Sequence, residues 1–181
     1  MAALWCDLAA TLVRILSYKM IVRAMPNTPA LIAMGMTGLY ATPDVSQQQR
    51  CSADAIMKAV GSTVWLDNEE KIDAITAISG SGPAYVFYFI EAMQQAAKEL
   101  GLSEQDATKI SLATFRGASE LASKSHEPAS KLRERVTSKG GTTFAALSQM
   151  EIANIKPLIV EAIKAAAARS KEIGDAWSKE Q

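Results

Sequence analysis

The stretch from Ile78 to Leu100 dominates the hydrophobic pattern of the chain. Pro83 suits the first position of a helix, where its missing N–H group costs nothing. Every position from Tyr85 to Ile90 is apolar or aromatic, which is typical of a helix that is buried on all sides. The glycines on either side of Ser81 predict a flexible turn before this helix. We therefore expect a central helix whose first half is covered by other helices, from this chain or from a partner. An ordinary core helix after a glycine-rich turn is the alternative.

Ahead of this helix the pattern predicts a small α/β segment. Runs typical of strands lie at Met20–Met25, Thr37–Thr42 and Thr63–Leu66, and a helix is expected from Pro43 to about Val60. A strand, a helix and a strand at this spacing form a βαβ fragment, which implies a piece of parallel sheet. Leucines and isoleucine at helical spacing from Leu4 to Leu16 predict a further amphipathic helix at the start of the chain.

After Asn68 the pattern is helical throughout. Besides the central helix, helices are expected at Glu69–Ile78, from about Glu104, after Pro128, through Leu147, and at Ile155–Ile173, where Gly174 follows the end. The helix from Glu104 is expected to turn one set of residues inward: Ile110, Ala113, Thr114, Gly117 and Leu121. The fold class is therefore mainly α, with an α/β piece at residues 1–68 and an all-helical domain at residues 69–181.

Composition and charge narrow the class of protein. The chain is 49% hydrophobic and 21% charged, as in a soluble globular protein. Its 19 basic and 19 acidic residues cancel, so neither nucleic acid nor a membrane is favoured as a partner. Cys6 and Cys51 have no metal-binding or disulfide pattern and suit a reducing cytoplasm. The single histidine, His126, is expected in a surface loop, and no metal site is predicted. The apolar start at Met1–Val13 has no basic leader and is too short to span a bilayer.

The segment from Thr137 to Thr143 carries the most chemical information. Its paired glycines and following threonines stand at a helix start, which predicts unpaired backbone N–H groups and partial positive charge there. Such a site suits a carboxylate or phosphate, with the hydroxyls of Ser138, Thr142 and Thr143 as further donors. The alternative is that these hydroxyls only cap the helix. A P-loop fits poorly, because Lys139 precedes the glycines instead of following them.

A second candidate is the segment Met25-Pro26-Asn27-Thr28-Pro29. Two prolines this close predict a rigid loop directly after a strand. The carboxyl ends of strands are where open parallel sheets bind ligands. A purely structural turn is the alternative reading of the same residues.

Three separated motifs of the chain resemble those of pyrroline-5-carboxylate reductases. The motifs are R-A-M-P-N-T-P-A at Arg23–Ala30, S-G-S-G-P-A-Y at Ser79–Tyr85 and V-T-S-K-G-G-T-T at Val136–Thr143. The resemblance extends from about Ile21 to the last helix. It implies a Rossmann-type NAD(P)-binding domain, of which residues 1–68 are the remnant. It also implies a helical dimerisation and substrate-binding domain at 69–181, similar to the C-terminal domain of 6-phosphogluconate dehydrogenase. No glycine-rich fingerprint precedes Ile21, so we expect the chain to start late in the first domain.

The resemblance also implies a reaction and roles for individual residues. Hydride passes from NAD(P)H, with NADPH favoured, to the C=N bond of 1-pyrroline-5-carboxylate, giving L-proline. By this likeness Thr143 is the catalytic residue, whose hydroxyl contacts the imine nitrogen. The substrate carboxylate is bound at Ser138, Gly140, Gly141 and Thr142, and the nicotinamide end of the cofactor at Met25, Pro26 and Asn27. No acid and base pair is needed, because the cofactor carries the difficult chemistry.

The same resemblance implies a homodimer or higher oligomer with its active site near the subunit boundary, and the cysteine usage indicates the cytoplasm. A partner subunit would then cover the apolar helix that starts at Pro83. Two other functions stay open. One is a non-catalytic dimerisation module derived from the reductase. The other is a β-hydroxyacid-type dehydrogenase, which needs a lysine on the helical domain; the Pro83 helix has none before Lys98.

Overall fold

The computed structural model describes residues 17–179, so the helix predicted between Leu4 and Leu16 lies outside the described residues. The chain divides into two compact units, which are taken separately below. Of the described residues, 17–84 and 161–179 belong to the first unit and 85–160 to the second. The predicted domain boundary near Asn68 stays a prediction.

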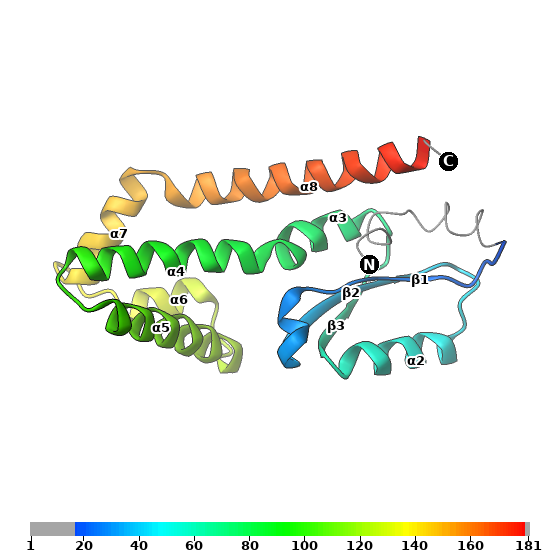
Figure 1. Ribbon diagram of the computed structural model, residues 1–181, viewed down its shortest axis with the longest axis horizontal. Coiled ribbons are helices and arrows are strands. Elements are labelled where there is room, and N and C mark those ends of the chain that lie inside the picture. Colours follow the sequence, from blue (N-terminus) through cyan, green and yellow to red (C-terminus); the bar gives the residue numbers. More distant parts are fainter. Residues whose placement is uncertain (1–16, 180–181) are drawn as a thin grey trace. The chain divides into compact units, whose positions relative to one another are not determined.

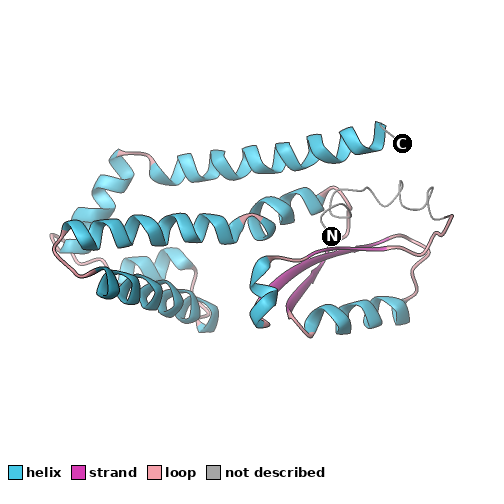
Figure 2. Ribbon diagram, in the orientation of Figure 1, coloured by secondary structure: helices cyan, strands magenta, loops and turns pink. Residues whose placement is uncertain are grey.

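A sheet of three strands forms the centre of the first unit (Figure 2). The strands are β1 (Val22–Met25), β2 (Gly35–Ala41) and β3 (Gly61–Trp65), in the order β1-β2-β3. β2 and β3 run parallel, with Leu39 opposite Trp65, which confirms the predicted βαβ fragment. β1 pairs with β2 in the antiparallel direction, with Met25 opposite Gly38. The central position of β2 explains why most of its residues are buried.

Two helices cover the sheet. α2 (Gln47–Lys58) packs against β2 and β3, α3 (Lys71–Ile75) packs against β2, and Figure 1 shows them on opposite faces. The core between these layers contains Leu39, Ile72 and Ala77, which are almost completely buried. Asp54 joins α2 to β3 because its carboxylate accepts hydrogen bonds from the Thr63 hydroxyl at 2.6 Å and from the Trp65 indole at 3.1 Å.

The predicted start of the helix at Pro43 is wrong by several residues. Ser46 is the N-cap of α2, and it exchanges two hydrogen bonds with Gln49 in a capping box. The Ser46 hydroxyl accepts from the Gln49 backbone N–H at 3.3 Å, and the Gln49 side chain accepts from the Ser46 backbone N–H at 2.8 Å. This reciprocal pair satisfies two donors that Pro43 has no means of satisfying.

The flexible turn predicted around Ser81 is also wrong. The chain stays helical here, from α3 through the π-helical turn η2 (Thr76–Gly80) into α4 (Gly82–Glu99). Neither Gly80 nor Gly82 has a positive φ angle. The glycines therefore do not supply turn conformations, and Gly80 has a different role that is described with the site below.

The second unit is all helical. It contains α4 from Tyr85 onward and then α5 (Glu104–Lys124), α6 (Ala129–Arg135), α7 (Thr142–Ile152) and the first turns of α8 (Ile155–Lys179). Gly101, at φ +93°, ends α4, and the N–H of Leu102 reaches back to the carbonyl of Ala97 at 3.0 Å. Ser103 caps α5 by accepting from the Asp106 N–H at 3.0 Å. The start of α5 agrees with the start predicted at about Glu104.

Within the described part of this single chain, the faces predicted to point inward are largely exposed. Ile110 and Leu121 of α5 are exposed, and the buried residues of that helix are Ala107 and Ser111. In α4 only Ile90 is buried, while Phe87 and Tyr88 are 58% and 72% exposed. The apolar stripes exist as predicted, but no element within residues 17–179 covers them.

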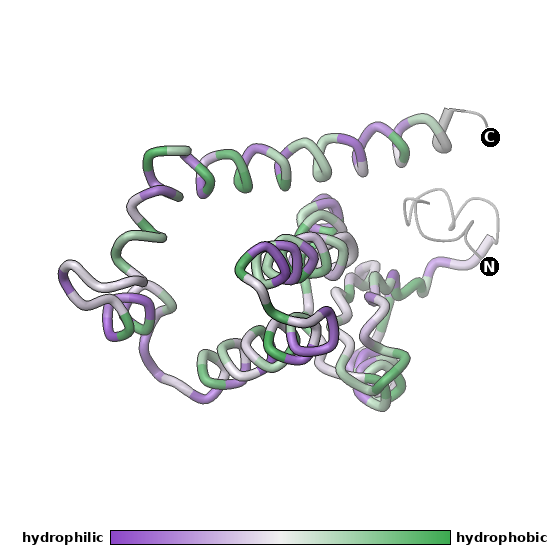
Figure 3. Tube along the Cα trace, turned by 60° about the vertical axis from the view of Figure 1, so that its left-hand side comes forward, coloured by the Kyte–Doolittle hydropathy of each residue, from purple (hydrophilic) through white to green (hydrophobic). Residues whose placement is uncertain are grey.

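The last helix is longer than predicted. α8 continues through Gly174, which is buried in the first unit, to Lys179. Its Ser170 hydroxyl donates to the Asp73 carboxylate of α3 at 2.6 Å, so tertiary contacts sustain the helix beyond the glycine. Figure 3 shows hydrophobic and hydrophilic positions alternating along α8, as expected for a helix with one apolar side.

Membrane and metal signals were sought among residues 17–179. None of the helices there combines the length and the apolar composition needed to cross a bilayer. The same part of the chain contains no cluster of three or more histidine, cysteine or acidic side chains arranged to hold a metal ion.

Candidate functional site

A network of hydrogen bonds centred on Asn27 fixes the loop after β1. Its side-chain amide donates to both the carbonyl and the hydroxyl oxygen of Ser79, each at 3.2 Å. Its carboxamide oxygen accepts from the backbone N–H of Met36 at 2.9 Å. The Ser79 hydroxyl closes the network by donating to the Met36 carbonyl at 3.4 Å. The loop after β1, the start of β2 and the π turn η2 are therefore joined through one carboxamide.

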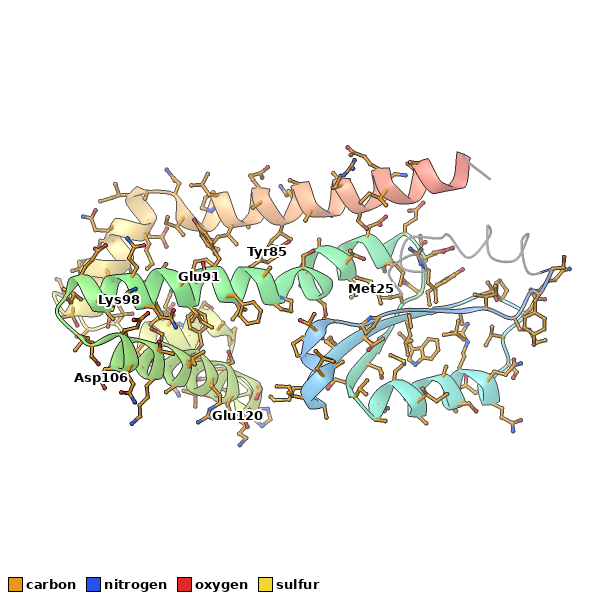
Figure 4. All side chains as sticks on the ribbon, in the orientation of Figure 1. Met25, Tyr85, Glu91, Lys98, Asp106 and Glu120 are labelled. Atoms are coloured by element: carbon orange, nitrogen blue, oxygen red, sulfur yellow. The ribbon has the colours of Figure 1, made fainter. Side chains whose placement is uncertain are left out.

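Met25, at the end of β1 and labelled in Figure 4, lies close to Gly80. A Cβ atom added to Gly80 would be 2.5 Å from the Met25 methyl carbon, which is closer than real Cβ atoms come to other atoms. Glycine at this position therefore allows the close approach. The loop and η2 line a cavity of 350 Å³, formed by Met25, Pro26, Asn27, Thr28, Ala30, Leu31 and Gly80.

The loop does not lie at the ligand-binding edge of a parallel sheet, contrary to the prediction. The loop follows the carboxyl end of β1, as predicted, but β1 runs antiparallel to β2. Met25 is therefore level with Gly38, the middle residue of β2, and not with the carboxyl ends of the parallel strands. After the loop the chain forms a turn of 3₁₀ helix, η1 (Thr28–Ile32), with Pro29 in its first turn. The cavity and the Asn27 network, and not the edge of a parallel sheet, mark this loop as a site.

The glycine-rich segment of the second unit connects α6 to α7. Gly140 has φ +74°, a conformation that favours glycine over other residues. Gly141 is the N-cap of α7, and a Cβ atom there would be 2.5 Å from the Ser138 hydroxyl oxygen. The φ angle therefore favours glycine at position 140, and the close approach of the Ser138 hydroxyl favours it at position 141. The Thr137 hydroxyl donates to the Arg133 carbonyl at 2.6 Å, which anchors the segment to the end of α6.

The start of α7 leaves donors available. No side chain caps the helix, so the alternative in which Ser138, Thr142 or Thr143 serves as the cap does not apply. The Gly141 N–H donates to the Ser138 carbonyl at 3.0 Å. This amide is therefore already paired, contrary to the expectation. The next two amides, of Thr142 and Thr143, are in the first turn of α7, where an α-helix supplies no acceptors. Thr143 is half-buried, while Ser138 and Thr142 are exposed.

The structure brings two of the three sequence motifs together. The residues Met25, Pro26 and Asn27 are joined to Ser79 and Gly80 of the second motif within the first unit. The third motif, with Thr143, belongs to the second unit. Sequence reasoning missed the contacts of Ser79, Gly80 and Met36. The spacing S-G-S-G carried a signal, but it was interpreted as a turn and not as a close contact.

A second cavity of the first unit has a volume of 530 Å³ and charged walls. Arg23 of β1 forms an ion pair with Glu69 at 3.0 Å, and their side chains are only 10% and 20% exposed. Asp175 hydrogen-bonds the ammonium group of Lys171 and, with the more distant Asp73 and Glu70, raises the pKa of Lys171 above its ordinary value. Each positive group of this cavity, Arg23 and Lys171, is thus paired with a carboxylate, which is the arrangement of a structural network.

Comparison with known proteins places the chain in a family. The model named "Pyrroline-5-carboxylate reductase dimerisation" matches residues 69–173. The chain belongs to the pyrroline-5-carboxylate reductase family. A pyrroline-5-carboxylate reductase of Pseudomonas aeruginosa is 45% identical over 155 residues, which are 86% of this chain and 57% of that protein. The chain thus spans just over half the length of this curated relative.

Solved structures of the same family have the same fold. A pyrroline-5-carboxylate reductase from Coxiella burnetii matches with a TM-score of 0.89 at 40% identity, covering 93% of this chain and 63% of that one. A pyrroline carboxylate reductase from Plasmodium falciparum, solved with NADP bound, matches with a TM-score of 0.84 at 32% identity. The match covers 91% of this chain and 66% of the Plasmodium chain. The predicted family and fold class, a partial Rossmann-like piece followed by a helical dimerisation domain, are therefore confirmed.

Proposed function

We propose that this chain takes part in the reduction of 1-pyrroline-5-carboxylate to L-proline with NADPH or NADH as the hydride donor. The observation that carries the proposal is the start of α7 in a member of this family. It offers the Thr142 and Thr143 amides without a capping side chain, next to a half-buried Thr143 hydroxyl. The substrate has two matching features, a carboxylate and an imine nitrogen.

The carboxylate of the substrate is the group that we assign to the helix start. Two amides in the first turn of α7 attract an anion through their N–H groups and through the helix dipole. The exposed Ser138 hydroxyl is one further donor, and Gly140 and Gly141 give the loop the backbone path that leaves room for the anion. Because the Gly141 amide already donates to Ser138, the Thr142 and Thr143 amides carry this role.

The Thr143 hydroxyl is assigned to the imine nitrogen. Hydride attack at the C=N carbon moves an electron pair onto nitrogen, so a hydrogen bond or proton at nitrogen makes the carbon more electrophilic. Hydride and one proton together convert the imine to the secondary amine of proline. Thr143 lies in the first turn of α7 and is half-buried, which limits competition from water for its hydroxyl.

The cofactor is assigned to the cavity at Met25, Pro26 and Asn27. Its volume of 350 Å³ and its mainly apolar lining suit a flat ring such as nicotinamide, and Asn27 adds a fixed polar group. NADPH is favoured because the Plasmodium falciparum relative is solved with NADP bound. When bound, the cofactor supplies the hydride, and the residues of this chain bind and orient it.

A homodimer or higher homo-oligomer in the cytoplasm is part of the proposal. The matched family model describes a dimerisation domain, and the second unit exposes large apolar side chains that a partner subunit would cover. They include Val86, Phe87, Tyr88, Leu121, Val136 and Ile152. Cys51, the cysteine within the described residues, is a free thiol, which suits a reducing compartment.

NADPH oxidation with 1-pyrroline-5-carboxylate tests the reaction. Replacing Thr143 by valine keeps the shape of the side chain but removes the hydroxyl, and kcat is expected to fall by about 10²-fold. Thr143→Ser, which keeps the hydroxyl, is the matched control and should retain most of the turnover. Equal turnover in the valine and serine variants would remove Thr143 from the mechanism.

The alternative, a non-catalytic dimerisation module, is favoured by the extent of apolar surface on the second unit. It predicts a particle of twice 19.4 kDa by light scattering together with no NADPH binding and no turnover. Turnover by the wild-type chain above the level of the valine variant excludes it.

A further inference from the structure

We propose that the π-helical turn η2 positions the cofactor-binding loop, with Ser79 and Gly80 as positioning residues. The proposal rests on the assignment of the cofactor to Met25, Pro26 and Asn27. It adds two residues that do not need to touch the substrate and that act through their contacts with the loop. π-Helical turns are rare and frequently occur at functional sites, where they re-aim side chains.

The first contact is polar. Ser79 presents two acceptors, its carbonyl and its hydroxyl oxygen, to the amide group of Asn27 at 3.2 Å each. A carboxamide that makes these bonds and also accepts from the Met36 N–H has one orientation left. Asn27, Ser79 and Met36 are all half-buried, so bulk water does not readily replace these bonds.

The second contact is steric. Met25 and Gly80 both line the 350 Å³ cavity, and the methyl end of Met25 rests where a Cβ atom of residue 80 would lie. A larger residue at position 80 displaces the flexible Met25 side chain from this place. A displaced methionine changes the shape of the cavity that the nicotinamide ring is proposed to occupy. Gly80 thus sets the position of Met25 by being small.

Gly80→Ala and Gly82→Ala form a matched pair for the test. Both glycines lie in the same helical run with φ angles open to alanine, but a Cβ atom at Gly82 meets nothing within 4 Å. Gly80→Ala is expected to raise the KM for NADPH about tenfold while the KM for 1-pyrroline-5-carboxylate stays unchanged. Gly82→Ala should leave both KM values at the wild-type level. A loss of stability alone would lower the active fraction in both assays and would not separate the two KM values.

Ser79→Ala tests the polar contact independently. It removes the hydroxyl but leaves the carbonyl acceptor of residue 79, so one of the two bonds from Asn27 remains. The expected rise in the KM for NADPH is a few-fold, smaller than for Gly80→Ala, again without change in the KM for the imino acid.

A second readout does not depend on turnover. With ¹³C-methyl methionine, the Met25 methyl resonance is assigned with a Met25→Leu variant and followed by NMR. The signal is expected to shift in Gly80→Ala and to stay in place in Gly82→Ala, and NADPH added to the wild-type chain should shift it as well.

The outcomes separate the two proposals. An unmoved Met25 signal in Gly80→Ala, or equal NADPH KM values in Gly80→Ala and Gly82→Ala, overturns the positioning role while the reductase function stands. A wild-type chain that neither oxidises nor binds NADPH overturns the proposed function, and with it the assignment of the cofactor to this loop. A shifted signal together with a selectively raised NADPH KM supports the positioning role.

Discussion

The two compact units of this chain differ in how far they bury their apolar side chains. In the first unit Leu39, Ile72 and Ala77 are enclosed between the sheet and its helices. In the second unit the buried residues are Ile90, Ala107 and Ser111, two of which are small, while Phe87 and Tyr88 are exposed. Both units have the hydrophobic patterns of a core, but within the described part of the chain only the first unit encloses one.

This difference shows that a hydrophobic pattern predicts which side chains are buried. It does not predict whether the residues that cover them belong to the same chain or to a partner. The aromatic run of α4 indicates a helix that is covered on all sides, yet its own unit leaves much of it open. A large exposed apolar surface of this kind marks an interface in a soluble protein. The second unit is therefore expected to gain stability from association, and the first to have it already.

Truncating the core of the first unit should have the largest effect. Leu39→Ala removes a side chain that is 0% exposed, and the free energy of unfolding is expected to fall by about 2–5 kcal/mol, measured by urea denaturation. Leu31→Ala, at a leucine that is 90% exposed, is the control and should change stability little. Equal losses at the two leucines would mean that β2 is not the centre of a closed core.

Charges on the apolar face of α4 should have the next largest effect. The double variant Phe87→Glu with Tyr88→Glu is expected to raise the dissociation constant of the dimer by about 30-fold or more, the loss of about 2 kcal/mol typical of one buried aromatic contact. Light scattering over a dilution series measures it. Gln95→Glu adds a charge to the same helix at an exposed polar position and is the control. A double variant that remains as dimeric as the wild type would contradict the contrast drawn between the units.

The ion pair between Arg23 and Glu69 should contribute less. Arg23→Met is expected to cost about 1–2 kcal/mol, because both charged groups are largely shielded from water and the variant loses the ion pair between them. Arg169→Met breaks the Arg169–Glu172 pair, whose side chains are 70% and 64% exposed, and should cost less than about 0.5 kcal/mol. Denaturant midpoints are measured for both variants. A similar loss of stability in the two would show that burial does not make the Arg23–Glu69 pair stronger than the exposed pair.

The smallest effect is expected in acid. A hydrogen bond from Lys58, with others from Thr63 and Trp65, lowers the pKa of Asp54 below its ordinary value of 3.8. A carboxyl group whose pKa is lower in the folded state stabilises the fold above its unfolded pKa, and this contribution disappears as the pH falls through the folded pKa.

Asp54→Asn should therefore lower stability near neutral pH and flatten its decrease below about pH 4. Urea midpoints measured between pH 6 and pH 3 check this slope against the wild type. A variant with an unchanged pH slope would show that Asp54 does not link α2 to β3 electrostatically.

Much of the fold could be predicted from local signals. Gly101 marks the end of α4 and Ser103 the start of α5. Both signals are local, because a left-handed glycine and a capping hydroxyl act on residues next to them in the sequence. The signals that failed depend on distant contacts. Gly174 does not end α8, where Ser170 is held by Asp73, almost a hundred positions earlier in the sequence. The pairing direction of β1 also follows from the whole sheet and not from its own residues.

The candidate site, too, could be predicted from the sequence only where local signals determine it. The free amides at the start of α7 follow from the glycine and threonine order, because a helix without a capping side chain leaves its first amides open. The Gly141 amide was misjudged because its acceptor, the Ser138 carbonyl, depends on the turn geometry. The contacts of Asn27 with Ser79 join residues that lie far apart in the sequence, and periodicity carries no information about such pairs.

The antiparallel strand β1 has one more consequence, for handling the protein. Within residues 17–179, β1 pairs with β2 alone and is an outermost strand of the sheet. Its far side therefore presents peptide groups that can template the addition of another extended segment. Concentrated samples should accordingly be checked for association of chains through the outer edge of β1.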